Sequence, residues 1–394
     1  MIVVVCGALA NRPANGGGAW TRLSWASGLT RLGCDVYFVE QIAPATCIDA
    51  SGVTCDVEMS VNLAYFKAVT EAFGLGAVSA LVLEGCERSI GLSWNELLQV
   101  ADAADLLVNI SGHLTVASLK PRFRRRAFID QDPGYTQFWH AEGRAEDRLR
   151  DHHVYFTVGE NIGHPECGIP AGNIDWRPIR QPVVLDHWPD VNVADDLNAP
   201  GGLTGHRFTT VASWRGPYGR VTHNGMQYGL KAHEFRKFAA LPTRTAETFE
   251  IALDVHPADR QDVDRLREHG WTIADPKSVA ADPFTFRDYV RRSSAEFSVA
   301  QGIYVETRSG WFSDRSVRYL ASGKPVLVQD TGFARHYPVG LGLVPFRTLE
   351  EAARGADAIA ADYGRHSRAA RAIATEFFDS DKVLSWMLQS VDLA

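Results

Sequence analysis

The sequence predicts an α/β protein made of two Rossmann-like domains, each a doubly wound parallel sheet, that face each other across a cleft. The first observation is length, because 394 residues are too many for one compact core and fit two domains of roughly two hundred residues. The second is that short apolar runs alternate with amphipathic helical stretches in both halves of the chain. The third is a stretch rich in Pro, Gly, Asn and Asp that interrupts this alternation near the middle.

The composition is that of an ordinary globular protein. Hydrophobic residues make up 45% and charged residues 22% of the chain, which excludes disordered and fibrous classes. The formal net charge of -7 argues against a specific nucleic-acid partner, whose binding surfaces are basic. No apolar stretch approaches the roughly 20 residues that a membrane span needs. Six cysteines without a CxxC pair predict free thiols, and the N-terminus lacks a basic leader, so we expect a cytoplasmic protein.

The first half opens with a strand, a glycine-rich loop and a helix. Residues 2–5 are all apolar, the loop GALANRPANGGG follows, and a helix is expected over 19–32 with Gly33 as its stop. A second strand over 35–40 completes a βαβ unit, which favours a parallel sheet. Further strands are expected at SALVLEG, DLLVNIS, RAFIDQD and VYFTVGE, and further helices at SVNLAYFKAVTEAF and HAEGRAEDRLRDHH.

The second half repeats the alternation after a linker and hinge over about 163–205, where periodicity is lost. We therefore expect a first domain over 1–185, a second domain over 206–376 and a closing helical segment over 377–394. In the second domain the expected strands are FTTVAS, FEIALDV, WTIAD, AEFSVA, PVLVQD and LGLVPF, and the expected helices are GLKAHEFRKFAAL, RQDVDRLREHG, FTFRDYVRRS and about 313–322.

Candidate site residues of the first half follow strand ends, because ligands of open parallel sheets bind beyond the carboxyl ends of strands. Gly17 and Gly18 stand in NGGG, directly before a helix, where the backbone can approach a ligand closely; a flexible inter-domain loop is the alternative. His113 follows the strand DLLVNIS, and Asp132 follows RAFI. Either side chain is a candidate general base; a structural histidine and an Asp-Pro-Gly turn are the alternatives.

In the second half, ASWRGPYG follows the first expected strand and places Ser213, Trp214 and Arg215 at the cleft. Arginine matches the geometry of phosphate oxygens, and a tryptophan can cover a base or sugar, whereas the alternative is a surface turn.

The segment RSGWFSDRSVRYLASGKPVLVQDTGF is the most informative. Ser313 and Asp314 stand at capping positions of a helix that runs to Ala321 and stops at Gly323. The start of such a helix binds a diphosphate through free N–H groups and the helix dipole, and Arg315 adds positive charge. The strand PVLVQD ends in the loop of Asp330, Thr331 and Gly332, which is expected to meet a donor sugar.

With the glycine loop, the helix and GCDVYFVE at its start and RYLASGKPVLVQDTGF near its end, the chain resembles a glycosyltransferase of the GT-B fold over nearly its whole length. This resemblance implies that residues 309–315 and 330–332 contact a nucleotide sugar, and that the last helix, about 379–393, returns to the first domain. The named residues of these two blocks are Ser309, Gly310, Trp311, Ser313, Asp314, Arg315, Asp330, Thr331 and Gly332.

One departure from the pattern concerns two carboxylates that many retaining members carry ahead of the Ala-Ser-Gly turn. Gly310 and Arg318 stand at those positions here, which leaves retention or inversion of the sugar configuration open. The segment SGWFSDRS resembles an atypical bacterial branch of this group.

The expected activity is transfer of a sugar, a hexose in the first place, from a nucleotide diphosphate sugar to a hydroxyl group of a small molecule or glycan. The resemblance implies no metal and no cofactor, because helix ends and basic side chains stabilise the leaving diphosphate in this fold. The alternatives are a nucleotide-sugar epimerase or hydrolase and a non-catalytic nucleotide-sugar-binding protein. An NAD-dependent dehydrogenase is disfavoured because GxGxxG is absent after the first strand.

Overall fold

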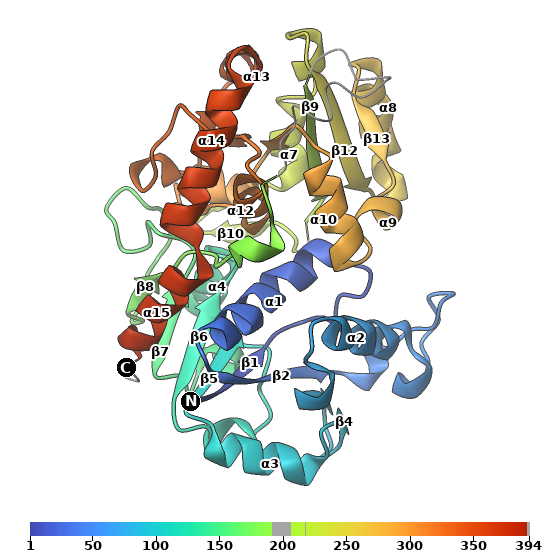
Figure 1. Ribbon diagram of the computed structural model, residues 1–394, viewed down its shortest axis with the longest axis vertical. Coiled ribbons are helices and arrows are strands. Elements are labelled where there is room, and N and C mark those ends of the chain that lie inside the picture. Colours follow the sequence, from blue (N-terminus) through green and yellow to red (C-terminus); the bar gives the residue numbers. More distant parts are fainter. Residues whose placement is uncertain (191–205, 217, 392–394) are drawn as a thin grey trace.

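The computed structural model describes residues 1–190, 206–216 and 218–391, and it has two parallel-sheet domains stacked one above the other (Figure 1). The first sheet has the order β4-β3-β2-β1-β5-β6-β7-β8, and the second has the order β13-β12-β9-β14-β15-β16. Both sheets place their first strand near the middle and wind outward in both directions, which is the doubly wound topology. The predicted fold class of two Rossmann-like domains is confirmed.

The first sheet is parallel except for the short edge strand β4, which pairs antiparallel with β3. Its strands are β1 (Ile2–Cys6), β2 (Asp35–Ile42), β3 (Ser79–Leu83), β4 (Ser89–Gly91), β5 (Leu106–Ile110), β6 (Arg126–Asp130), β7 (Val154–Thr157) and β8 (Trp176–Pro178). The helices of this part are α1 (Gly16–Arg31), α2 (Val61–Ala72), α3 (Trp94–Ala103), α4 (Tyr135–Ala141) and α5 (Glu146–Leu149).

The second sheet is parallel throughout the strand pairs that the structure describes. Its strands are β9 (Arg207–Ser213), β12 (Thr248–Asp254), β13 (Thr272–Ala274), β14 (Ala295–Ser298), β15 (Val326–Gln329) and β16 (Leu343–Phe346). A hairpin of β10 (Val221–His223) and β11 (Met226–Tyr228) stands apart from it. The helices are α7 (Lys231–Arg236), α8 (Arg260–Glu268), α9 (Pro276–Val279), α10 (Pro283–Arg291), α11 (Gly302–Glu306), α12 (Asp314–Ala321), α13 (Leu349–Ala361), α14 (Tyr363–Ile373) and α15 (Ser380–Ser390).

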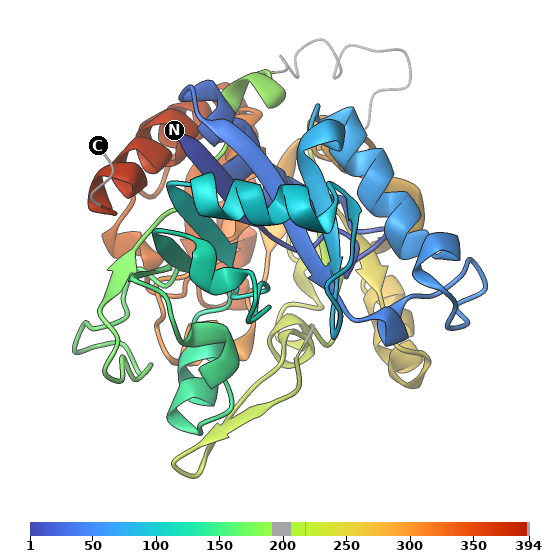
Figure 2. The same cartoon turned by 90° about the horizontal axis from the view of Figure 1, so that it is seen from below.

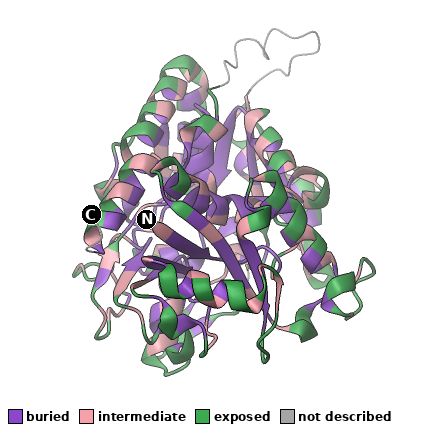
Figure 3. Cartoon of the chain, turned by 60° about the horizontal axis from the view of Figure 1, so that its bottom comes forward, coloured by how far each residue is buried: buried purple, intermediate pink, exposed green. Residues whose placement is uncertain are grey.

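Strand β1 is apolar at every position because both faces of the sheet are covered. Val3 and Val5 pack into a core shared with α1, α2 and α15. Val4 and Cys6 point to the opposite face, where they pack with α3. The two-residue alternation of a strand thus supplies two separate cores, as expected of a parallel sheet. Figure 3 shows the strands of this sheet buried beneath helices whose outer faces are exposed.

Helix α1 begins within the glycine run, three residues before the predicted start, because Asn15 caps it. The Asn15 side chain accepts a hydrogen bond of 2.8 Å from the Gly18 N–H. The glycines allow the second domain to approach the helix start. A Cβ atom at Gly16 would lie 2.0 Å from the backbone oxygen of Asp282, and the Gly16 N–H donates to the Ala280 carbonyl at 2.8 Å.

The C-terminal segment crosses from the second domain back to the first along one side of the molecule (Figure 1). Helix α14 ends in a π-helical turn over 374–378, and α15 then packs against α1. Leu384 and Met387 of α15 are fully buried in the first core. A Cβ atom at Gly28 would lie 2.5 Å from the Leu384 side chain, so a glycine on α1 sets how closely the two helices approach.

The structure differs from the sequence prediction in several connecting segments. The stretch HAEGRAEDRLRDHH is divided between the end of α4 and the short helix α5, because Gly143 adopts a positive φ of 69° between them. Within the predicted linker, residues 176–178 form the edge strand β8; residues 191–205 lie outside the described part. Helix α3, with its Ser93–Glu96 capping box, was not predicted.

The hairpin β10–β11 of the second domain packs on α4 of the first domain (Figure 2). Phe138 of α4 stacks on Tyr228 with ring centroids 5.1 Å apart, and it lies 4.8 Å from the ring of His223. The two domains are therefore in contact at the hairpin as well as at the start of α1. None of the helices in the described residues is long and apolar enough to cross a membrane.

Substituting Gly16 by alanine is expected to destabilise the protein by about 1–3 kcal/mol, because the new methyl group would overlap the backbone of the second domain. Chemical denaturation measures this change. Gly364→Ala is the matched control: it also lies in the first turn of a helix, but its nearest neighbour is a flexible arginine tip 3.5 Å away. Equal stability of the two variants would contradict the contact at Gly16.

Candidate functional site

A pocket of about 320 Å³ lies between the domains, where the carboxyl ends of both sheets meet. The first domain contributes the start of α1 and the loop after β6, and the second contributes the end of β9 and the starts of α7 and α12. Eight residues predicted from the sequence line it: Gly17, Gly18, Asp132, Ser213, Trp311, Ser313, Asp314 and Arg315. The other eight, which do not line it, are His113, Trp214, Arg215, Ser309, Gly310, Asp330, Thr331 and Gly332.

Trp214 and Arg215 are engaged elsewhere in the second domain. Trp214 is 1% exposed in the core, and its indole N–H donates to Asp262 at 2.8 Å. Arg215 forms a two-contact ion pair with Asp259, with N···O distances of 2.6 and 3.1 Å. Both side chains therefore connect the segment after β9 to the start of α8.

The loop of Ser309 and Gly310 and the loop of Asp330, Thr331 and Gly332 lie outside the pocket and contact the first domain. The Gly310 N–H donates to the Thr331 carbonyl at 2.9 Å, which joins the two loops. Asn161 of the first domain is hydrogen-bonded to the backbone of both loops. Its backbone N–H donates to the Ser309 carbonyl at 3.1 Å, and its side-chain amide donates to the Gly332 carbonyl at 3.2 Å. Asp330 is paired with Arg347 at 2.6 Å.

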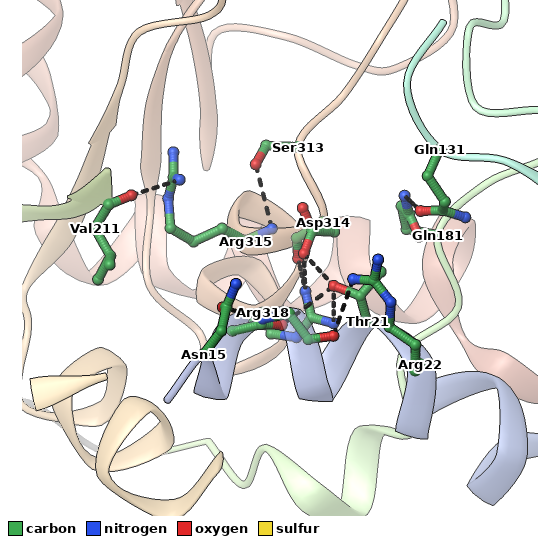
Figure 4. A network of polar contacts seen from close by, with 12 residues as sticks. Asn15, Thr21, Arg22, Gln131, Gln181, Val211, Ser313, Asp314, Arg315 and Arg318 are labelled. Carbon is green, nitrogen blue, oxygen red and sulfur yellow. Dashed lines mark hydrogen bonds and ion pairs between the residues drawn. The ribbon is translucent and has the colours of Figure 1, made fainter. Parts of the chain in front are cut away.

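Helix α12 begins at the pocket and is joined there to the first domain (Figure 4). Ser313 caps it, with its hydroxyl accepting from the Arg315 N–H at 3.2 Å. The Thr21 hydroxyl of α1 donates to Asp314 Oδ2 at 2.6 Å, and Arg318 pairs with the same carboxylate at 2.9 Å. Burial opposes ionisation of Asp314, but Arg318 and Thr21 outweigh it, so its pKa lies below the usual value.

Arg315 braces the second sheet. Its guanidinium pairs with the buried Glu296 at 2.5 Å. It also donates to the Val211 carbonyl and to the Ser298 hydroxyl, both at 2.8 Å. Arg315 therefore joins the ends of β9 and β14 and presents only part of its guanidinium to the pocket.

Lys231, which the sequence did not single out, is the first residue of α7 and lines the pocket. Among the residues that the structure describes, its ammonium has no hydrogen bond or ion pair. Burial, and after it the charge of Arg315, lowers the pKa of Lys231 to about 7 against the opposing effect of Glu296 and Asp314. Lys231 thus gives the pocket an amine that is about half protonated near pH 7 and forms no ion pair with the described residues.

Arg22 is a second cation that sequence reasoning missed. Its aliphatic stem lies over Gly7 at the end of β1, where a Cβ atom would be 2.5 Å from Arg22 Cγ. One nitrogen donates to the Gly18 carbonyl at 3.1 Å, and the buried Nε has no partner. Arg22 forms no ion pair within the described part of the chain, and its guanidinium lies toward Thr21 and Asp314 (Figure 4).

Asp132 lies on the first-domain side of the pocket, and its loop is held by Asp130. The fully buried Asp130 carboxylate accepts hydrogen bonds from Thr136, Gln137 and Thr157 at 2.7–2.8 Å. Burial, and after it the charge of Asp130, raises the pKa of Asp132 to about 6, while Arg22 opposes the shift. A carboxylate with this pKa is ionised near neutral pH and is well matched to accepting a proton.

His113 differs from Asp132 in both position and titration. It lies outside the pocket lining, and burial, with smaller effects of Arg22, Arg148 and Arg12, lowers its pKa to about 3. The imidazole is therefore neutral throughout the physiological range.

Gln131 and Gln181 complete the polar lining on the first-domain side. Gln181 donates to Gln131 Oε1 at 2.5 Å, and the buried Gln131 Nε2 has no partner (Figure 4). The described residues contain no group of three or more His, Cys, Asp or Glu side chains arranged to hold a metal ion.

No family model matches the chain, and no curated protein matches it in sequence. Solved structures match over its whole length. Anabaena HepE in complex with UDP-glucose gives a TM-score of 0.63 at 12% identity, with 100% of both chains covered. An alpha-glucosyltransferase in complex with UDP gives 0.57 at 11%, covering 99% of both chains. Sucrose-phosphate synthase from Thermosynechococcus elongatus gives 0.55 at 14%, covering 99% of this chain and 98% of that one.

These neighbours are glycosyltransferases of the GT-B fold, and the predicted GT-B fold is confirmed. At identities of 11–14% the likeness concerns the fold.

Replacing Thr21 by valine is expected to lower the free energy of unfolding by about 1.5–3 kcal/mol, because a hydrogen bond to the charged Asp314 carboxylate is lost between the domains. Thr30→Val on the same helix is the control, since that hydroxyl only bonds the carbonyl of Ala26 within α1. Urea denaturation of both variants gives the comparison. If the Thr21 variant is no less stable than the control, the inter-domain bond contributes nothing.

Proposed function

We propose that the protein is a glycosyltransferase that moves a hexosyl group from a nucleotide diphosphate sugar to a hydroxyl group of an acceptor. One observation carries the proposal: the inter-domain pocket sets cations without close counter-ions, Lys231 and Arg22, opposite a carboxylate whose pKa is raised to about 6, Asp132. Cations stabilise a leaving diphosphate, and a carboxylate of this pKa accepts the proton of an attacking hydroxyl.

In this proposal the second domain holds the donor. Lys231 and the N-terminal turn of α12 would bind the diphosphate, and Arg22 would add charge from the first domain. Positive charge placed before the reaction lowers the energy of the charge that develops on the leaving diphosphate. Asp314 is already satisfied by Thr21 and Arg318, so its carboxylate adds little repulsion toward the incoming anion.

The first domain would bind the acceptor beside Asp132. The Asp132 carboxylate would take the proton of the attacking hydroxyl as the bond to the anomeric carbon forms. Tyr218 and Tyr304 orient this carboxylate, with oxygen distances of 3.3 and 3.4 Å. His113 is the weaker candidate, because a pKa of about 3 makes a poor base.

The similar solved structures suggest which nucleotide sugars to test first as donors. HepE has been solved with UDP-glucose, and the alpha-glucosyltransferase with UDP. We therefore propose a uridine diphosphate hexose as the first donor. The proposal includes no metal and no organic cofactor, because side chains and a helix start supply the charge. A reducing cytoplasm suits the six cysteines, which are free thiols.

The reaction itself is tested by incubating the protein with a panel of nucleotide diphosphate hexoses, with and without hydroxyl acceptors, and separating the products. Release of the nucleoside diphosphate that depends on the acceptor, with a new glycoside formed, supports the transferase. Donor turnover without an acceptor would indicate an epimerase or hydrolase instead. Donor binding without any turnover would indicate a non-catalytic nucleotide-sugar-binding protein.

Asp132→Asn is expected to lower kcat by about 10²–10⁴-fold with little change in the donor KM, because the amide cannot accept the proton. The pH profile of kcat/KM should be bell-shaped. It rises as Asp132 loses its proton near pH 6 and falls as Lys231 loses its proton near pH 7. Wild-type turnover in Asp132→Asn, with His113→Asn inactive, would reassign the base to His113.

Donor binding is expected to be linked to proton uptake by Lys231, because its pKa of about 7 leaves much of the lysine neutral at pH 8 while the diphosphate binds the charged form. Calorimetric titration with UDP in buffers of different ionisation enthalpy measures the uptake. Lys231→Arg should bind UDP without it, and Lys231→Ala should bind at least about tenfold more weakly.

Lys237→Ala is the matched control for this titration, since Lys237 lies just past α7, is exposed and pairs with Glu234 at 2.7 Å. If Lys231→Ala binds UDP as tightly as the control variant does, Lys231 does not take part in donor binding.

A further inference from the structure

We propose that Gln131 and Gln181 select the sugar of the donor. The Gln131 amide donates to a hydroxyl group of the hexose, and the ring of that hexose packs on Trp311. All three side chains line the pocket between the domains. The inference rests on the proposed function, because it names the residues that recognise the transferred hexose.

Gln131 and Gln181 form a pair of nearly buried amides on the first-domain side of the pocket. Gln131 is 9% exposed, and Gln181 is 5% exposed. The Gln181 Nε2 group donates to Gln131 Oε1 at 2.5 Å, whereas Gln131 Nε2 has no partner among the described residues (Figure 4). A buried amide is costly to leave unpaired, and buried donors in proteins almost always have an acceptor. The unpaired N–H groups therefore indicate a ligand that brings an acceptor oxygen.

The backbone on either side of Gln181 is fixed. The Ile179 N–H donates to the end of β7 at 2.9 Å, and the Val183 N–H donates to the Phe378 carbonyl at 2.8 Å. Gln181 bonds the oxygen of Gln131, so the nitrogen of that amide is the atom left for a ligand. The terminal torsion of a glutamine has a broad range, so a small rotation turns its N–H toward a hydroxyl in the pocket.

The proposed reaction brings the hexose to this pair. Gln131 stands directly before Asp132, just past the carboxyl end of β6. The anomeric carbon has to lie between the diphosphate at Lys231 and the attacking hydroxyl at Asp132, so the hexose ring lies near the residue that precedes Asp132. A sugar hydroxyl both donates and accepts hydrogen bonds and carries no charge, which suits a neutral amide.

Trp311 supplies an apolar surface for the same ring. Its indole is half-buried and stacks on the Tyr304 ring, with ring centroids 4.5 Å apart. The Tyr304 hydroxyl donates to Asp132 at 3.4 Å, so the indole packs on the ring that contacts the proposed base. Sites for small ligands typically combine aromatic side chains with a few placed polar groups. Here the indole covers the C–H groups of the sugar, and the amide bonds a hydroxyl.

The backbone of Trp311 is fixed by contacts from both domains. Its N–H donates to the Ser309 hydroxyl at 3.2 Å, and the Thr331 hydroxyl donates to its carbonyl at 2.5 Å. It also forms an isolated antiparallel bridge with Gly159 of the first domain. The backbone that carries the indole is thus in place before a donor binds. Preorganised groups bind a ligand at a lower entropic cost.

The test is a binding cycle between protein and ligand. Calorimetry at pH 7 compares UDP-glucose with the analogues that each lack one hydroxyl of its glucose, in the wild type and in Gln131→Leu. In the wild type we expect at least one analogue to bind about tenfold or more weakly than UDP-glucose, because it leaves the buried amide unpaired. In Gln131→Leu this analogue and UDP-glucose should bind equally. UDP itself should bind both proteins with the same affinity.

Three further variants complete the cycle. Gln131→Met keeps the length of the side chain without its N–H groups, so it gives the same answer if the leucine variant does not fold. Gln99→Leu replaces an exposed glutamine on α3 and is the matched control, which should keep the hydroxyl preference. Trp311→Leu should weaken UDP-glucose and every analogue alike, relative to UDP.

UDP binding separates this inference from the proposed function. If the wild type binds no UDP, the donor site fails, and this inference fails with it. If UDP binds but no analogue differs from UDP-glucose, the inference is overturned and the transferase proposal stands. A hydroxyl preference that survives both substitutions of Gln131 would overturn the inference as well.

Discussion

The structure depends on a buried polar link between α1 of the first domain and α12 of the second. Asp314 accepts the Thr21 hydroxyl across the interface and pairs with Arg318, which is 3% exposed, so a carboxylate at the helix start is satisfied from both domains. The glycines of α1 make this possible, because only a residue without a side chain fits between Asn15 and the backbone of Ala280 and Asp282. The link joins the two domains in the lining of the pocket, and the contacts at Gly16, at Asn161 and at the hairpin β10–β11 join them around it.

The charges of the pocket follow from that arrangement. The second domain brings Lys231 and the start of α12, and the first brings Arg22 and Asp132. Arg315 is committed to Glu296 and to the end of β9, so it shapes the pocket and also lowers the pKa of Lys231. Asp130, fully satisfied by its neighbours, holds the Asp132 loop and raises the pKa of that carboxylate. Arg315 and Asp130, which have no proposed ligand contact of their own, thus shift the pKa values of Lys231 and Asp132.

The sequence predicted the features that depend on local chemistry. Alternating apolar runs gave both sheets, and Ser313 was correctly predicted as the cap of a helix that begins at Asp314. Contacts between segments that are far apart in the chain could not be predicted from the sequence. Gly17 and Gly18 of the glycine run line the pocket, as predicted, but the contact of Gly16 with a backbone more than 260 positions away was not foreseen. Lys231 stands in GLKAHEF, which resembles any surface helix, and its place in the pocket lining follows only from how the two domains meet. Arg215 looked like a phosphate ligand because nothing in its neighbourhood reveals the partner Asp259.

The central claim is that a nucleotide diphosphate occupies the pocket between the domains. A crystal structure of the full chain with UDP tests it most directly. The account predicts the diphosphate against the Lys231 ammonium and the first turn of α12, with Arg22 within ion-pair distance. A nucleotide bound outside this pocket, or a diphosphate turned away from Lys231, would contradict it.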